Sequence, residues 1–126
     1  MRKQIVKVPG LAPSRVLSPA TRFGDLVFVA GRTGRNAKTG EYEPDIKLQT
    51  RHTLEDIKKI LEAAGSSMDQ VLSNTCYLTN TKDFEGFNQV YLEYFPADRP
   101  ARTTVGTALM AKGALVEITA VSCIPS

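Results

Sequence analysis

The chain has 126 residues, of which 42% are hydrophobic, and this size suits one compact domain with a single core. The net charge is +3, and the lysines and arginines are scattered among the acids, so charge alone does not indicate a nucleic-acid-binding surface. No apolar run approaches the roughly 20 residues that a membrane-spanning helix requires, and the first ten residues are too polar to form a secretory leader.

The first half of the chain is predicted to contain strands and one helix. Gln4–Val8 alternates in part and meets a Pro-Gly turn signal, which favours an edge strand. Two prolines interrupt the next segment, so Arg15–Leu17 is at most a short strand. The apolar run Leu26–Ala30, ended by a glycine, is typical of a central strand buried on both faces. Apolar residues at helical spacing then predict a helix over Ile46–Ala64, with Gly65 as its C-terminal glycine.

The second half is predicted to hold three strands and a second helix. Val71–Thr79 is rich in β-branched and aromatic residues and indicates a strand. Phe84–Phe95 carries an aromatic stripe at helical spacing, which predicts a helix that Asp83 can cap and whose stripe faces the core. Ala101–Thr107 and Ala114–Cys123 are the last two predicted strands.

These elements predict an α+β fold, a single domain over residues 1–126 in which two helices pack on one face of a mixed sheet of about six strands. Helices are roughly 10–12 Å across and strands lie about 4.8 Å apart, so two helices cover one face only. The last strand is largely apolar on both faces. The uncovered face therefore needs a partner, and the simplest one is another copy of the chain in a closed ring or dimer.

The residues available for metal or cofactor binding are few. Cys76 and Cys123 lie far apart in a chain without a leader, so we expect reduced thiols and a cytoplasmic protein. His52 is the only histidine, and a lone helix histidine is more often structural than catalytic. Residues 31–34 lack both the ending of a nucleotide-binding loop and the dinucleotide spacing. We therefore expect any chemistry to proceed without a bound transition metal.

The stretch Arg99–Gly106 places two guanidiniums three residues apart at the start of a strand. The planar donors of an arginine match a carboxylate bidentately, so Arg99 or Arg102 could hold a small acid in one orientation. The alternative is a solvated arginine beside a proline turn, since surface arginines are common.

Glu117 interrupts an otherwise apolar strand, where a carboxylate is costly unless it is paired, hydrated or protonated. If Glu117 lines the same cleft as Arg102, the arginine can fix a substrate carboxylate while the glutamate holds a water or shuttles a proton. The two residues would then form a minimal hydrolytic pair. The alternative is a structural salt bridge between Glu117 and a basic residue of the same or a neighbouring subunit.

Three motifs in this order resemble the YjgF/RidA family of reactive-intermediate deaminases. They are Phe28–Gly31, the second helix with Asn88 and Tyr91, and Pro100–Val105 followed by Glu117 fifteen residues after Arg102. The similarity spans nearly the whole chain. It implies a chorismate-mutase-like α+β fold, a homotrimer with clefts between subunits, and hydrolysis of enamine or imine intermediates, such as 2-aminoacrylate, to a keto acid and ammonia without a cofactor.

The resemblance also implies roles for individual residues. Arg102 would clamp the substrate carboxylate, and Glu117 would activate the water that attacks the imine carbon. Main-chain groups near Gly31 and Thr104 would orient the nitrogen end of the substrate, and Asn88 would support the site across the subunit boundary. Arg99 is then left as a structural or rim residue. The implied substrate-binding residues are Gly31, Arg32, Asn88, Tyr91 and Thr104.

The chain departs from the family pattern at two positions. The best-studied branch has a tyrosine after the first-loop proline, whereas Pro19 is followed by Ala20, so that aromatic pocket wall is missing or supplied elsewhere. Arg32 stands after Gly31, where that branch often has a neutral amide. We hypothesise that Arg32 serves an additional carboxylate, as in an aminomuconate-like dicarboxylic enamine; the alternative is an ion pair with an acid such as Glu41.

Two other functions remain open at this point. A trimer could bind or sense a small keto acid without turning it over. An RNA-binding or endoribonuclease function has also been linked to the family, but the modest charge and the lack of a basic stripe with interleaved aromatic residues argue against it.

Overall fold

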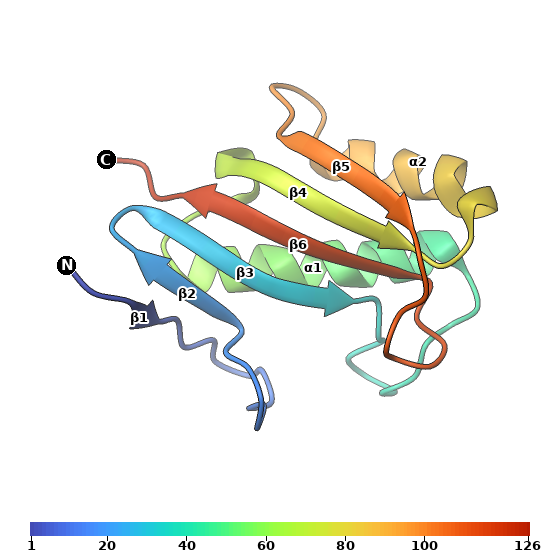
Figure 1. Cartoon of the computed structure of the whole chain (residues 1–126), viewed down its shortest axis with the longest axis horizontal. Coiled ribbons are helices and arrows are strands. Elements are labelled where there is room, and N and C mark those ends of the chain that lie inside the picture. The colour runs from blue at the N-terminus through green and yellow to red at the C-terminus, as the bar shows by residue number, and fades with distance from the viewer.

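The computed structural model describes residues 1–126, which form one six-stranded sheet and two helices (Figure 1). The strands are β1 (Gln4–Ile5), β2 (Ala20–Phe23), β3 (Leu26–Thr33), β4 (Val71–Leu78), β5 (Ala101–Gly106) and β6 (Val116–Cys123), and the helices are α1 (Ile46–Ala63) and α2 (Phe84–Tyr94). The strand order is β1-β2-β3-β6-β4-β5, and only β4 and β5 run parallel. The predicted α+β fold with a mixed sheet is confirmed.

Both helices lie on one face of the sheet, behind it in the view of Figure 1. The core fills the space between the two layers, and its largest fully buried side chains include Leu54 and Ile57 of α1, Phe87 of α2 and Ile118 of β6. The other face of the sheet is uncovered, as its strand and helix content predicted. No helix of the structure is both long and apolar enough to cross a membrane.

The ends of α1 follow the local sequence. Asp45 caps its N-terminus, because the side-chain oxygen accepts hydrogen bonds from the main-chain N–H groups of Lys47 at 2.8 Å and Leu48 at 3.1 Å. The helix ends at Ala63, and Gly65 has the positive φ of 87° that its place after the helix predicted. The predicted helix is therefore confirmed, with an end one residue earlier.

His52 has the structural role that was predicted for it, whereas Asp83 does not form the predicted helix cap. His52 of α1 lies 2.7 Å from Glu43, Nε2 to Oε1, which ties the preceding loop to the helix and agrees with the expected structural role. Asp83 occupies the N-cap position of α2, but its side chain accepts no capping hydrogen bond. Asn80 instead accepts one from the Lys82 main chain at 2.9 Å, so the short turn before α2 carries the cap.

The N-terminal strands differ from the prediction. β1 is shorter than predicted, and Arg15–Leu17 is not a strand, because the Ser14 hydroxyl holds this segment in an exposed turn. The second strand is instead β2, which starts directly after Pro19 and forms a hairpin with β3 through Gly24 at φ 59°. The sequence did not predict β2, because a proline usually marks the interruption of a strand. Here Pro19 directly precedes the first residue of the strand.

β3 continues beyond its predicted end at Gly31. Val29 pairs with Ala120 and Arg32 pairs with Ile118, so two residues of β3 lie opposite a single residue of β6. This arrangement is a β-bulge, in which the strand bends and the ladder resumes with an extra residue. The bulge lets Arg32 lie on the helix-covered face, whereas unbroken pairing would have placed it on the uncovered face.

The uncovered face carries large apolar side chains. Leu26 and Phe28 are 40% and 44% exposed, so β3 is buried on one face only and not on both as predicted. Phe23 and Val105 lie on the same face of the sheet and are also exposed. Exposed apolar groups of this size that share one face usually mark a surface that associates with another molecule.

Candidate functional site

Arg102 lies on the edge strand β5 and extends toward α2. Its Nη1 donates a hydrogen bond to Asn88 Oδ1 at 2.8 Å. The guanidinium carbon lies 4.6 Å from the ring centroid of Tyr91, 5.4 Å from that of Phe87 and 5.7 Å from that of Phe84. Three aromatic rings and one amide oxygen therefore fix the direction of the cation. We call Arg102, Asn88, Tyr91 and Thr104 the arginine half-site.

The positive charge of Arg102 has no counter-ion in the chain. None of the ion pairs includes Arg102, although the side chain is partly buried. A guanidinium has five N–H donors, and the bond to Asn88 is the only side-chain hydrogen bond that Arg102 makes. A partly buried charge is costly when it is unpaired. The half-site is therefore suited to an anion from outside the chain.

The groups beneath Arg102 are kept neutral. Asn74 Nδ2 donates a hydrogen bond to the Tyr91 hydroxyl at 3.0 Å. Burial raises the pKa of the Tyr91 phenol, and the bond from Asn74 lowers it only in part. Burial also raises the pKa of the Cys76 thiol to about 12, against a smaller opposing effect of the Arg102 charge. Neither group can act as a base at neutral pH.

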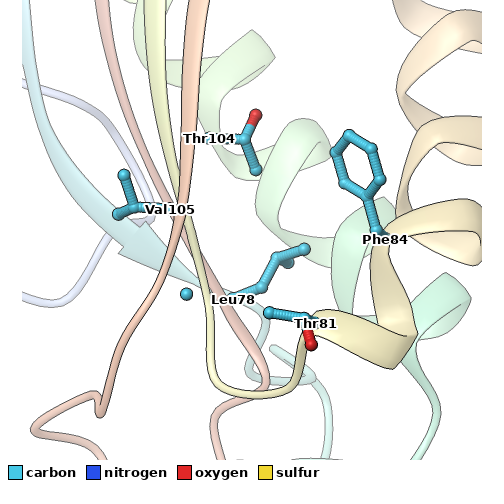
Figure 2. A pocket seen from close by; sticks show the side chains of 6 residues that line it. Leu78, Thr81, Phe84, Thr104 and Val105 are labelled. Carbon is cyan, nitrogen blue, oxygen red and sulfur yellow. The ribbon is translucent and has the colours of Figure 1, made fainter.

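Two hollows flank Arg102 between β5 and α2. The first, of about 240 Å³, is drawn in Figure 2, where Thr104 and Phe84 point into the space between strand and helix and Val105 points to the other side of β5. The Thr104 hydroxyl is buried and has no hydrogen-bond partner. The second hollow, of about 430 Å³, is lined by both Arg102 and Arg99. A small molecule could therefore reach the guanidinium from the second hollow.

Arg99 hydrogen-bonds to main-chain oxygens at the end of α2 and not to the residues around Arg102. Its Nε donates to the main-chain oxygen of Phe95 at 3.1 Å, and its Nη2 donates to that of Pro96 at 3.2 Å. A basic side chain often satisfies the carbonyl groups that a helix C-terminus leaves unpaired. Arg99 therefore holds the end of α2, in agreement with its expected structural role.

Glu117 projects from β6 on the uncovered face, away from Arg102. Glu117 pairs with Tyr77 of β4, while Arg102 pairs with Asn74 of the same strand. Because successive side chains of a strand alternate between faces, partners three positions apart place their side chains on opposite faces. Within a single chain, Glu117 and Arg102 therefore do not line the same cleft.

The Glu117 carboxylate rests on the bulge of β3. A Cβ atom at Gly31 would collide with Glu117 Oε2 and lie 3.1 Å from Cδ, so only glycine leaves room for the carboxylate. Thr33, the cross-strand partner of Glu117, shares a hydrogen bond of 2.7 Å with the Tyr42 hydroxyl. Glu117 forms no ion pair and no side-chain hydrogen bond within the chain, so the alternative of an intrachain salt bridge is not observed. We call Gly31, Thr33 and Glu117 the glutamate half-site.

The structure also places the two residues at which the chain departs from the family pattern, Arg32 and Ala20. Arg32 pairs with Asp56 of α1 at 3.3 Å, Nη2 to Oδ2, so the ion-pair alternative is observed with Asp56 and not Glu41 as the acid. The bulge causes this, because it sends Arg32 to the face that α1 covers. Ala20 is 1% exposed in the core and pairs with Val29, so position 20 does not form a pocket wall.

Four residues in or beside the half-sites were not identified as site residues from the sequence. Phe84 and Thr81 line the first hollow, and Thr33 and Tyr42 form their hydroxyl pair beside Glu117. The aromatic spacing of α2 could have singled out Phe84, because the ring lies at the exposed start of the helix. Nothing in the local pattern distinguishes the other three from ordinary loop and strand residues.

Comparison with known proteins gives consistent results. Residues 9–124 match the profile of a family described as Endoribonuclease L-PSP. A RutC family protein from Pyrococcus horikoshii is 45% identical over 106 residues, covering 83% of this chain and 84% of the relative. The structure resembles that of the YjgF gene product from E. coli (TM-score 0.87, 27% identity, 95% and 98% of the two chains). It also resembles E. coli TdcF with bound serine (TM-score 0.84, 30% identity, 95% and 98% of the two chains).

Proposed function

Because the chain belongs to the YjgF/Rid family, whose profile is described as Endoribonuclease L-PSP, we propose that it is a cofactor-independent hydrolytic deaminase. Its substrates are enamine or imine intermediates of small acids, such as 2-aminoacrylate, and its products are a keto acid and ammonia. We place the catalytic roles on Arg102 and Glu117, and substrate contacts on Gly31, Asn88, Tyr91 and Thr104.

The observation that carries the proposal is the unneutralised guanidinium of Arg102. It is held by Asn88 and Tyr91 and has no carboxylate partner in the chain. A substrate carboxylate would complete this arrangement with two parallel hydrogen bonds. The serine bound to the related TdcF, a small molecule with a carboxylate, supports this class of ligand.

The two half-sites require a second copy of the chain. Arg102 and Glu117 lie on opposite faces of the sheet, and the uncovered face carries exposed apolar side chains. A contact between the arginine half-site of one copy and the glutamate half-site of the next is heterologous, and such contacts can close into a ring. We propose a homotrimer with three equivalent sites at its subunit boundaries.

In the proposed reaction, Arg102 binds the substrate carboxylate and Glu117 of the neighbouring copy holds a water beside the imine carbon. Glu117 accepts a proton from the water as the water oxygen bonds to the carbon of the protonated imine, and the product is a neutral carbinolamine. Glu117 then returns this proton to the amine nitrogen. Ammonia leaves as the C–N bond breaks, and the hydroxyl group gives its proton to Glu117 as it becomes the carbonyl of the keto acid. General acid–base help contributes about 10²–10⁴-fold, and positioning of an already electrophilic imine can supply much of the remainder.

A coupled assay tests the proposal directly. An imine of the 2-aminoacrylate type is generated in the cuvette by a second enzyme, and the release of ammonia is timed with and without this protein. We expect faster release with the wild-type chain than with Glu117→Gln. Equal rates with wild type, the variant and buffer, across both monocarboxylic and dicarboxylic imines, would overturn the deaminase proposal.

A second candidate is a trimer that binds a small acid without turnover. The bound serine of TdcF favours this reading, because serine is an amino acid and not an imine. Keto-acid binding by both wild type and Glu117→Gln, combined with no acceleration of ammonia release, would decide for it. The endoribonuclease description of the family is less well supported in this chain, whose 16 basic residues face 13 acidic ones and form no cluster in the sequence.

A further inference from the structure

A polar hollow of about 300 Å³ lies beside β3 and α1, and in the sheet two strands, β6 and β4, separate β3 from the β5 strand that carries Arg102. Of the residues assigned to the proposed reaction, it shares only Gly31. Its walls are the N-terminal segment 10–12, the end of β3 and the middle of α1. The hollow exists because β3 is longer than its neighbour: β2 begins at Ala20, opposite Val29, so Arg32 and Thr33 have a strand partner on one side only.

The charged residues that line this hollow are unbalanced. They are two arginines, Arg32 and Arg35, and one carboxylate, Asp56. Arg35 is exposed and belongs to no ion pair. Arg32 meets Asp56 through a single long contact of 3.3 Å from Nη2, and its Nε is buried without any hydrogen-bond partner. A buried donor without an acceptor is unfavourable, so the hollow lacks at least one acceptor group.

Two hydroxyl groups add a further donor. Thr33 and Tyr42 both line the hollow, and their oxygens are 2.7 Å apart. Only one of the two hydroxyl protons can lie between the oxygens, so the other is free to donate elsewhere. Guanidinium and hydroxyl donors that line one space are the groups that bind carboxylate and phosphate oxygens in proteins.

We propose that this hollow binds the oxyanion group of a small molecule, a carboxylate or a phosphate, between Arg32 and Arg35. Arg32 contributes the donors that Asp56 leaves free, Arg35 adds a second positive charge at the rim, and the free hydroxyl proton of the Thr33–Tyr42 pair completes the donor set. The hollow shares Gly31 and Thr33 with the glutamate half-site, but the two arginines that carry the proposal, Arg32 and Arg35, belong to neither half-site.

Asp56 gives the site a distinctive electrostatic signature. It competes with an incoming anion for Arg32 and repels the anion's charge, so its neutralisation should strengthen anion binding while loss of Arg35 weakens it. If Arg32 and Asp56 form only a hydrated structural ion pair, neither substitution should change the affinity for anions. Opposite effects of two neighbouring substitutions therefore distinguish a binding site from a hydrated salt bridge.

The test is a titration of the full-length assembled protein with inorganic phosphate and, separately, with malonate, at constant ionic strength. Amide chemical shifts of Arg32 and Ala37, which line the hollow and belong to neither half-site, report binding there. We expect saturable shifts with a dissociation constant in the millimolar range for at least one anion. Arg35→Ala should weaken binding about tenfold, as expected for one charge-assisted contact, and Asp56→Asn should tighten it several-fold.

Arg15→Ala and Glu62→Gln are matched controls, because both residues are exposed, lie outside the hollow and change the net charge by the same amounts. Unchanged affinity in both controls supports a local site, and thermal unfolding verifies that all variants are folded. A response to phosphate alone identifies a phosphate site, and a response to malonate alone a carboxylate site. No saturable shift with either anion, or equal changes in the control variants, would overturn the proposal.

Discussion

Arg102 and Glu117 project from opposite faces of one sheet, because their partners on β4, Asn74 and Tyr77, are three positions apart. Each side chain is partly buried, and neither has an ion-pair partner in its own chain. This relationship determines which experiments can separate the contributions of the two residues.

Arg102→Lys should remove most of the deaminase activity while the protein stays folded. A lysine keeps the positive charge, but a single ammonium cannot form two parallel bonds to a carboxylate or hold the bond to Asn88 in the same plane. Loss of one charge-assisted hydrogen bond of about 1.5–3 kcal/mol lowers kcat/KM by roughly 10–100-fold. Arg15→Lys is the control, because Arg15 is exposed and belongs to neither half-site. Near wild-type turnover in Arg102→Lys would contradict the proposed clamp.

Mixing two inactive variants should restore activity if each site uses two chains. Arg102→Ala and Glu117→Gln are unfolded together in equal amounts, refolded and assayed. In a randomly assembled ring, about one quarter of the boundaries join an intact Arg102 to an intact Glu117, so about one quarter of the wild-type rate returns. Each variant refolded alone is the control, and a mixture no more active than these controls would mean that the two residues do not share a site between chains.

Gly31→Ala should reduce turnover with little loss of stability. The added methyl collides with the Glu117 carboxylate, which is the mobile end of a side chain and can swing away. Gly34→Ala is the contrasting variant, because its methyl would lie 2.6 Å from Gln49 Cα, and main chain cannot move aside cheaply. We expect a cost of about 1–3 kcal/mol or more for Gly34→Ala. Urea unfolding and the ammonia assay measure the two effects, and a large fall in stability for Gly31→Ala would refute this account.

Phe87→Ala should destabilise the chain far more than Phe84→Ala. Phe87 is fully buried in the core, whereas Phe84 is 46% exposed at the start of α2. Truncation of a buried phenylalanine costs about 3–5 kcal/mol through lost burial and the cavity left behind. Both rings face Arg102, so the pair also separates the effect on stability from the effect on binding. Equal unfolding free energies for the two variants would contradict the assigned core.

Alkaline pH should destabilise the protein in part through Cys76. Burial raises the pKa of this thiol from 9.0 to about 12 in the folded chain, so the unfolded chain releases the proton first. The stabilisation is therefore complete below about pH 9 and is lost as the pH rises toward about 12. Between these limits the loss reaches at most about 1.4 kcal/mol for each pH unit. Denaturant unfolding of wild type and Cys76→Ala should diverge over this range, and parallel curves would contradict the assignment.

The sequence was sufficient to predict the helices and strands whose residue pattern depends only on neighbouring positions in the chain. The spacing of Leu54, Ile57 and Leu61 predicts α1, and the β-branched residues of β4 and β6 predict those strands, because both patterns depend only on neighbours along the chain. The resemblance in Pro100–Val105 and Glu117 singled out two partly buried charged residues that the structure leaves without counter-ions.

The faces of the sheet could not be predicted in the same way. Whether Arg102 and Glu117 share a face depends on the register of both strands with β4, and β4 lies between them in space but not in sequence. Arg32 was assigned to the substrate side because a bulge of one residue is invisible in the pattern, and that bulge turns it toward Asp56. The strand that contains Ala20 could not be predicted, because it begins directly after a proline.

The opposed directions of the two half-sites also make any activity that uses both of them depend on protein concentration. In the proposed ring, a single chain contains every residue of the site but no complete copy of it, so dilution that separates the chains removes the activity. Mass action then couples turnover to assembly, and the specific activity should fall steeply once the concentration drops below the dissociation constant of the ring.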